Sequence, residues 1–108
     1  MDSEKREKVV NHIREMSAYG GKIPITDDTE IYYDLRLHGD DLYELVVWLG
    51  KEFGVSTNVK LRDYGPGEGP LSFLFRKQRE RRELEQRPYK SLKVRDILAV
   101  IETGRWPA

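Results

Sequence analysis

The segment from Asp40 to Phe53 constrains the fold most, because its apolar residues recur at steps of three and four between two glycines. Such steps place the apolar side chains on one stripe of an α-helix. Segments 3–18 and 94–103 show the same spacing. Since each stripe must be buried against another element, the sequence predicts an all-α domain with three main helices. The apolar residues are Val9, Val10, Ile13 and Met16 in the first segment, Leu42, Leu45, Val46, Leu49 and Phe53 in the second, and Val94, Ile97, Leu98 and Ile101 in the third.

Segment 22–39, between the first two predicted helices, has no helical pattern. It contains Pro24 and a polar cluster at 26–29, and its run of three apolar residues at 31–33 is too short to predict a strand. We expect a long loop that Ile31, Leu35 and Leu37 hold to the core.

A second irregular segment, at about 56–90, precedes the last helix. Three glycines and two prolines within 64–70 predict a loop there. Residues 71–87 favour a helix that is apolar at its start, charged toward its end and stopped before Pro88.

The composition sets limits on function. The 108 residues fit a single domain, 1–108, and 19 Lys plus Arg balance 19 Asp plus Glu, so no net charge attracts nucleic acid or an anionic membrane. Cysteine is absent, which excludes disulfides and thiolate nucleophiles. The charged start is not followed by an apolar run, so we expect neither a signal peptide nor a membrane span. We therefore expect a cytoplasmic protein.

The residues around Gly39 resemble the attachment region of acyl carrier proteins, in which an Asp-Ser-Leu triplet precedes an acidic helix. Here the triplet reads His38-Gly39-Asp40. The features that match the family in type and order are Asp34-Leu35, Asp41, Glu44, Leu45, Val46, Leu49, Glu52, Phe53 and segment 92–98. Three features resemble, more specifically, a small bacterial family of cytoplasmic carrier-like proteins of unknown function. They are the Gly-Asp-Asp variant, segment 89–92 and the ending Gly104-Arg105-Trp106.

This resemblance implies an acyl-carrier-like helical bundle with a long first loop and a charged helix inserted at about 56–90. It also implies that the family's phosphopantetheine group is missing, because the serine hydroxyl that forms the phosphodiester is replaced by Gly39, which has no side-chain oxygen. The remaining serines lack the context of a loop followed by an acidic helix; they are Ser3, Ser17, Ser56, Ser72 and Ser91. We therefore expect no cofactor.

The resemblance further implies a protein partner with a basic patch, which would dock on Asp40, Asp41, Glu44 and Glu52. Complementary charge of this kind raises encounter rates and selects partners. The ordinary explanation for acidic residues at a helix start is their favourable interaction with the helix dipole. Their spacing does not match a calcium loop, so we expect no metal site.

The only concentration of basic residues lies at 76–87. Such a cluster can neutralise phosphates, but Glu80, Glu83 and Glu85 dilute it, so nucleic-acid binding is not expected. Neither His12 nor His38 has a nucleophile arranged beside it, and we expect no enzyme.

These observations favour a non-catalytic, carrier-like protein-protein interaction module. Two alternatives stay open: a genuine acyl or peptidyl carrier modified at another hydroxyl, and a nucleic-acid adaptor that binds through the basic helix.

Overall fold

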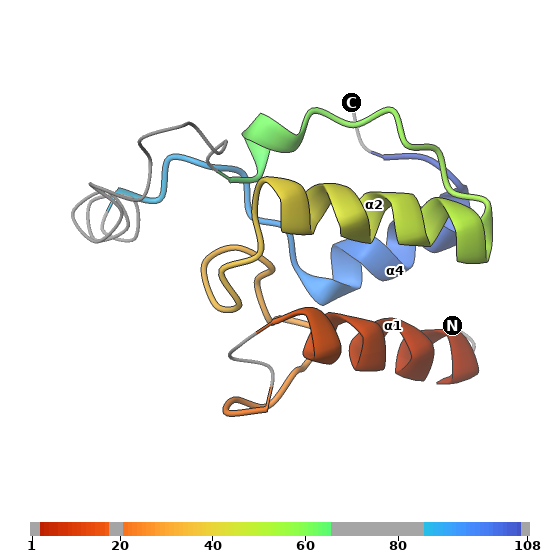
Figure 1. Cartoon of the computed structure of the whole chain (residues 1–108), viewed down its shortest axis with the longest axis horizontal. Helices are drawn as coiled ribbons and strands as arrows, with labels where there is room; N and C mark the ends of the chain where they lie inside the picture. The colour runs from red at the N-terminus through yellow and green to blue at the C-terminus, as the bar shows by residue number, and fades with distance from the viewer. Residues whose placement is uncertain (1–2, 18–20, 66–85, 107–108) are drawn as a thin grey trace.

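The computed structural model describes residues 3–17, 21–65 and 86–106. Within these ranges the regular structure is helical and no strand forms, so the all-α prediction is confirmed for this part of the chain (Figure 1). The second and last helices have the predicted bounds, whereas the first ends two residues before the predicted Ala18. The elements are helices α1 (Ser3–Met16), α2 (Asp40–Phe53) and α4 (Val94–Thr103), with a short 3₁₀ turn, η1 (Leu61–Asp63).

The three helices lie side by side, with α2 and α4 running in the same direction and α1 running opposite to both (Figure 1). Each helix buries its predicted stripe except for Met16 and Phe53, which are only partly buried at the helix ends. Burying one large aliphatic side chain contributes about 1.5–3 kcal/mol. The completely buried side chains, at 0% exposure, are Val9 and Ile13 of α1, Leu45 and Leu49 of α2, and Val94 and Ile97 of α4.

Glycine ends two of the helices. Gly54 follows α2 with φ 71°, and Gly104 follows α4 with φ 81°, so both have the left-handed conformation of a helix C-terminus. Their backbone N–H groups donate to Gly50 O at 3.0 Å and to Val100 O at 2.7 Å. These glycines explain why the helix ends could be predicted from the sequence.

The long first loop is fixed to the core, as expected. Ile31, Leu35 and Leu37 are at most 2% exposed. The backbone N–H of Ile31 donates to Leu92 O at 2.8 Å, next to a single antiparallel bridge between residues 30 and 93. The loop is thus joined to the chain that enters α4.

The chain after α2 runs back along that helix and pairs with the C-terminal tail (Figure 1). Ser56 N–H donates to Gly104 O at 2.9 Å, and the indole Nε1–H of Trp106 donates to Ser56 O at 2.9 Å. Trp106 is 8% exposed and belongs to the core. The tail is therefore part of the packed domain.

Most of the predicted charged helix lies outside the described residues. Its predicted stop before Pro88 agrees with the described residues, because Gln86 is helical and Arg87, with φ 48°, is not. The helical conformation is disfavoured directly before a proline. The described flanks meet, since Lys90 N–H donates to Asp63 O at 2.7 Å. We call residues 63–65 and 89–90 the neck.

Candidate functional site

Gly39 immediately precedes α2 and has φ 56° and ψ −125°. Residues with a side chain rarely adopt this conformation, which costs them about 1–3 kcal/mol. Gly39 O accepts a hydrogen bond from Tyr43 N–H at 3.0 Å, which fixes it in the first turn. Sequence reasoning treated Gly39 only as the loss of a hydroxyl, but the backbone itself favours glycine here.

His38, the residue before Gly39, is packed inside the protein. It is 8% exposed, and its ring lies 5.5 Å from that of Tyr32, edge to face. A Cβ added to Gly65 would lie 3.0 Å from the Cβ of His38, so the neck packs directly on this residue. The pattern suggested that His38 merely replaces an aspartate, and it gave no sign of this packing.

The acidic start of α2, which we define as Asp40, Asp41 and Glu44, is exposed. Within the described ranges no ion pair involves these three residues. The fourth predicted partner-binding residue, Glu52, is separate from them at the other end of α2. Its carboxylate lies 2.7 Å from Lys8 Nζ and so connects α2 to α1.

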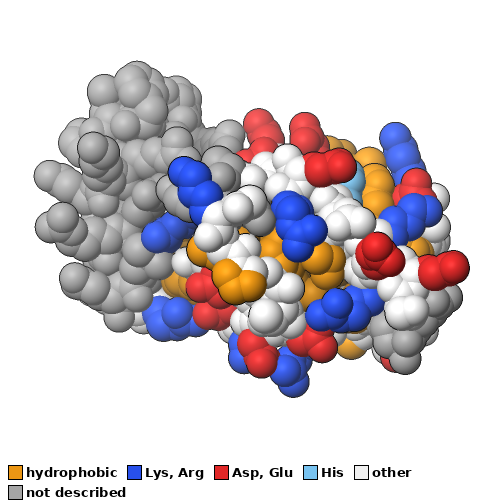
Figure 2. Space-filling model, turned by 90° about the horizontal axis from the view of Figure 1, so that it is seen from below, with side chains coloured by type: hydrophobic (Ala, Val, Ile, Leu, Met, Phe, Trp, Pro, Cys, Tyr) orange, Lys and Arg blue, Asp and Glu red, His pale blue; other side chains and the backbone are white. Residues whose placement is uncertain are grey.

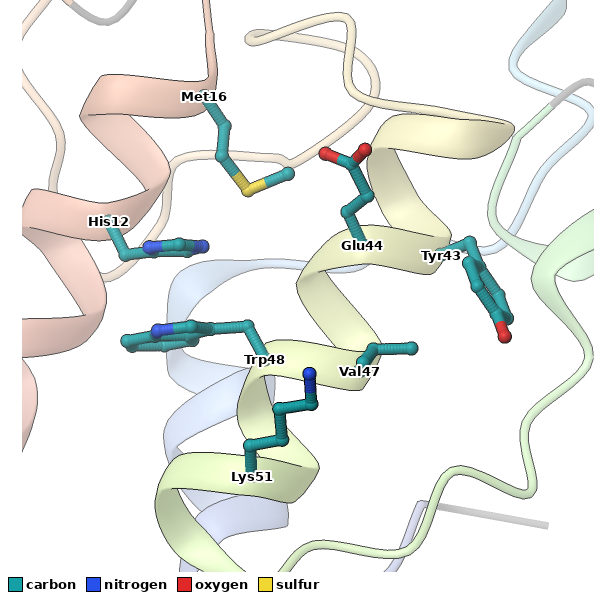
Figure 3. A pocket seen from close by; sticks show the side chains of 7 residues that line it. All are labelled: His12, Met16, Tyr43, Glu44, Val47, Trp48 and Lys51. Carbon is teal, nitrogen blue, oxygen red and sulfur yellow. The ribbon is translucent and has the colours of Figure 1, made fainter.

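A groove of about 300 Å³ lies between α1 and α2 (Figure 3). From α1 it is lined by His12 and Met16. Five residues of α2 complete it: Tyr43, Glu44, Val47, Trp48 and Lys51. Trp48 is half-buried and packs against the edge of the hydrophobic core.

The aromatic pair of the groove joins the two helices. The rings of His12 and Trp48 are 3.9 Å apart and nearly parallel, with an interplanar angle of 3°. Burial lowers the pKa of His12 below its ordinary value of 6.5, although Glu15, Glu52 and Glu44 oppose the shift. Burial of His12 in this position therefore favours its neutral imidazole.

Glu30 is the centre of a polar cluster that sequence reasoning missed. Its carboxylate accepts hydrogen bonds from Arg87 Nη2 at 2.5 and 2.6 Å and from Ser91 Oγ at 2.6 Å. Burial would raise the pKa of Glu30, but these hydrogen bonds outweigh it and the pKa is lowered. Arg87 also lies 4.2 Å from the ring centre of Tyr33. The cluster joins residues 57 positions apart, and no local pattern reveals such a contact.

Acidic and basic side chains are interspersed on the face shown in Figure 2, so neither sign dominates it. In the part of the chain that the structure describes, no group of three His, Asp or Glu side chains could hold a metal ion. Among the helices in the same part, none has the length and apolarity needed to cross a membrane.

Comparison with known proteins places the chain in one family. The model of the DUF1493 family, described as a protein of unknown function, matches residues 4–107, and the chain belongs to this family. No curated protein and no solved structure matches the chain.

Proposed function

We propose that this protein is a non-catalytic, acyl-carrier-like interaction module that has no phosphopantetheine and binds a protein partner with a basic patch. The observation that carries the proposal is the combination at the start of α2. Gly39 supplies no oxygen for attachment, while Asp40, Asp41 and Glu44 are exposed directly beside it. The surface thus offers negative charge without a prosthetic group.

Two of the remaining serine hydroxyls are already engaged in hydrogen bonds, which supports this interpretation over a carrier modified elsewhere. Ser17 is 8% exposed, and its Oγ donates to Leu35 O at 2.9 Å. Ser91 donates to Glu30. Ser17 is buried. Ser91 is exposed in the loop before α4, but its hydroxyl is bonded to Glu30, and the first turn of that helix contains Arg95 as well as Asp96.

The absence of modification is tested by mass. The protein is incubated with coenzyme A and a broad-specificity phosphopantetheinyl transferase, and its intact mass is compared with that of an authentic carrier treated in parallel. We expect the carrier to gain one phosphopantetheine and this protein to remain unchanged. A stoichiometric gain would instead support the genuine carrier, and peptide mapping would identify the modified hydroxyl.

The binding surface is tested by charge reversal. A partner is first isolated with the wild-type protein, and its affinity for the Asp41→Lys/Glu44→Lys variant is then measured. We expect binding at least about tenfold weaker, mainly through slower association at low salt. A matched variant reverses the basic segment instead, with Arg79, Arg81 and Arg82 changed to Glu. If only this second variant loses affinity while both remain folded by circular dichroism, the acidic start of α2 is not the interface.

A further inference from the structure

Helix α2 has a second stripe in addition to the one buried in the core. Glu44, Val47, Trp48 and Lys51 follow one another at steps of three, one and three, which places them on one face. This face forms the α2 side of the groove, with Glu44 at one end, Lys51 at the other and the two apolar residues between them (Figure 3).

The order of charges along this stripe is self-complementary. When two identical helices pack antiparallel about a two-fold axis, each residue meets its counterpart at the same distance on the other side of the axis. An axis between Val47 and Trp48 places Glu44 of one copy opposite Lys51 of the other, and the reverse pair follows by symmetry. The same axis places Val47 of each copy opposite Trp48 of the other.

We propose that the groove between α1 and α2 is a homodimer interface, in which a second copy of this chain packs its α2 antiparallel to the first. The apolar middle of the groove supplies the driving force, and the two symmetry-related Glu44–Lys51 pairs fix the register. Tyr43 also lines the groove and is 60% exposed, so it offers further apolar surface to a second copy. A second copy is favoured over a foreign partner because a single stripe supplies both members of each charge pair.

The proposal is tested by charge exchange between copies. The molar mass of the full chain is measured by sedimentation equilibrium over a concentration series for the wild type, Glu44→Lys and Lys51→Glu. We expect the wild type to dimerise and each variant to associate at least about tenfold more weakly, because each faces two like-charged pairs. Glu102→Lys, at an exposed site on α4, is the matched control and should dimerise as the wild type does.

The decisive sample is an equimolar mixture of Glu44→Lys and Lys51→Glu. Every charge pair between these two variants is again a lysine opposite a glutamate, so the mixture should recover the affinity of the wild type. A wild type that is monomeric throughout the series, or folded variants whose mixture stays monomeric, would overturn the proposal. Recovery also excludes misfolding as the reason for the loss in the single variants.

This interface uses Glu44, which also belongs to the acidic start of α2, so the two proposals need separate readouts. Lys51→Glu leaves the acidic residues in place and should weaken the dimer at least about tenfold, while the partner of the proposed function still binds. Asp41→Lys lies outside the symmetric charge pairs and should weaken partner binding while the dimer persists. Failure of one proposal is therefore distinguishable from failure of the other.

Discussion

Replacement of Trp106 by phenylalanine examines whether the C-terminal tail stabilises the domain. In the wild type the indole donates to Ser56 O at 2.9 Å, and its ring lies 6.4 Å from that of Tyr64. Phenylalanine keeps most of the apolar surface but has no donor. The main loss in Trp106→Phe is thus one hydrogen bond, which leaves the Ser56 carbonyl without its partner.

The size of this loss depends on how far the hydrogen bond is shielded from water. Trp106 is 8% exposed and Ser56 is half-buried, so the bond is partly shielded. Leaving one buried polar group without a partner costs about 1–3 kcal/mol, and about 1–2 kcal/mol is expected for this partly shielded carbonyl. For a domain of this size, a loss of about 2 kcal/mol lowers the melting temperature by on the order of 10 °C. Trp106→Ala also removes the buried ring and should cost roughly 3–5 kcal/mol.

The assay is guanidinium unfolding followed by circular dichroism, with thermal melts as a second measure. Arg105→Ala is the matched control, because its exposed side chain precedes the tryptophan and its loss should change stability by less than about 0.5 kcal/mol. If Trp106→Phe unfolds at the same denaturant concentration as Arg105→Ala, the tail does not belong to the cooperative unit and the reasoning is refuted.

Two further predictions concern pH. The lowered pKa of His12 means that the folded state binds fewer protons than the unfolded chain. The free energy of unfolding should therefore fall as the pH drops below 6.5. His12→Phe, which can retain the stack on Trp48, should remove this part of the pH dependence in urea titrations. Because the pKa of Glu30 is lowered, its charged carboxylate stabilises the fold above pH 4.5, the ordinary pKa, and this contribution is lost as the pH falls through the folded pKa. Glu30→Gln should therefore destabilise the protein at neutral pH. The difference in unfolding free energy between this variant and the wild type should shrink in acid. An equal difference at neutral and acidic pH would show that the bonds from Arg87 and Ser91 to Glu30 do not depend on its charge.

The helices could be predicted because their signals are local. The stripe of α2 is continuous and ends at Gly54, so both its face and its bounds could be read from neighbouring residues. The loop contacts of Ile31, Leu35 and Leu37 followed because large aliphatic side chains need burial wherever the backbone is irregular.

The groove and the polar cluster could not be predicted, because both depend on contacts between residues that are distant in the sequence. The groove needs His12 and Trp48 to meet across two helices, and the polar cluster needs Glu30 to meet Arg87. Spacing within one segment contains no information on either pair. The conformation of Gly39 also could not be predicted, because a glycine in the sequence indicates backbone freedom but not the φ and ψ that it adopts in the fold.

The neck fixes the two ends between which residues 66–85 are connected. Asp63 and Lys90 are joined by a hydrogen bond of 2.7 Å and by charges 3.6 Å apart, so the described residues before and after segment 66–85 lie next to each other. Doubling the length of a flexible loop between fixed ends costs only about 0.6 kcal/mol. A segment of different length between residues 65 and 86 is therefore expected to change the closure entropy by little, because the neck holds both of its ends next to each other.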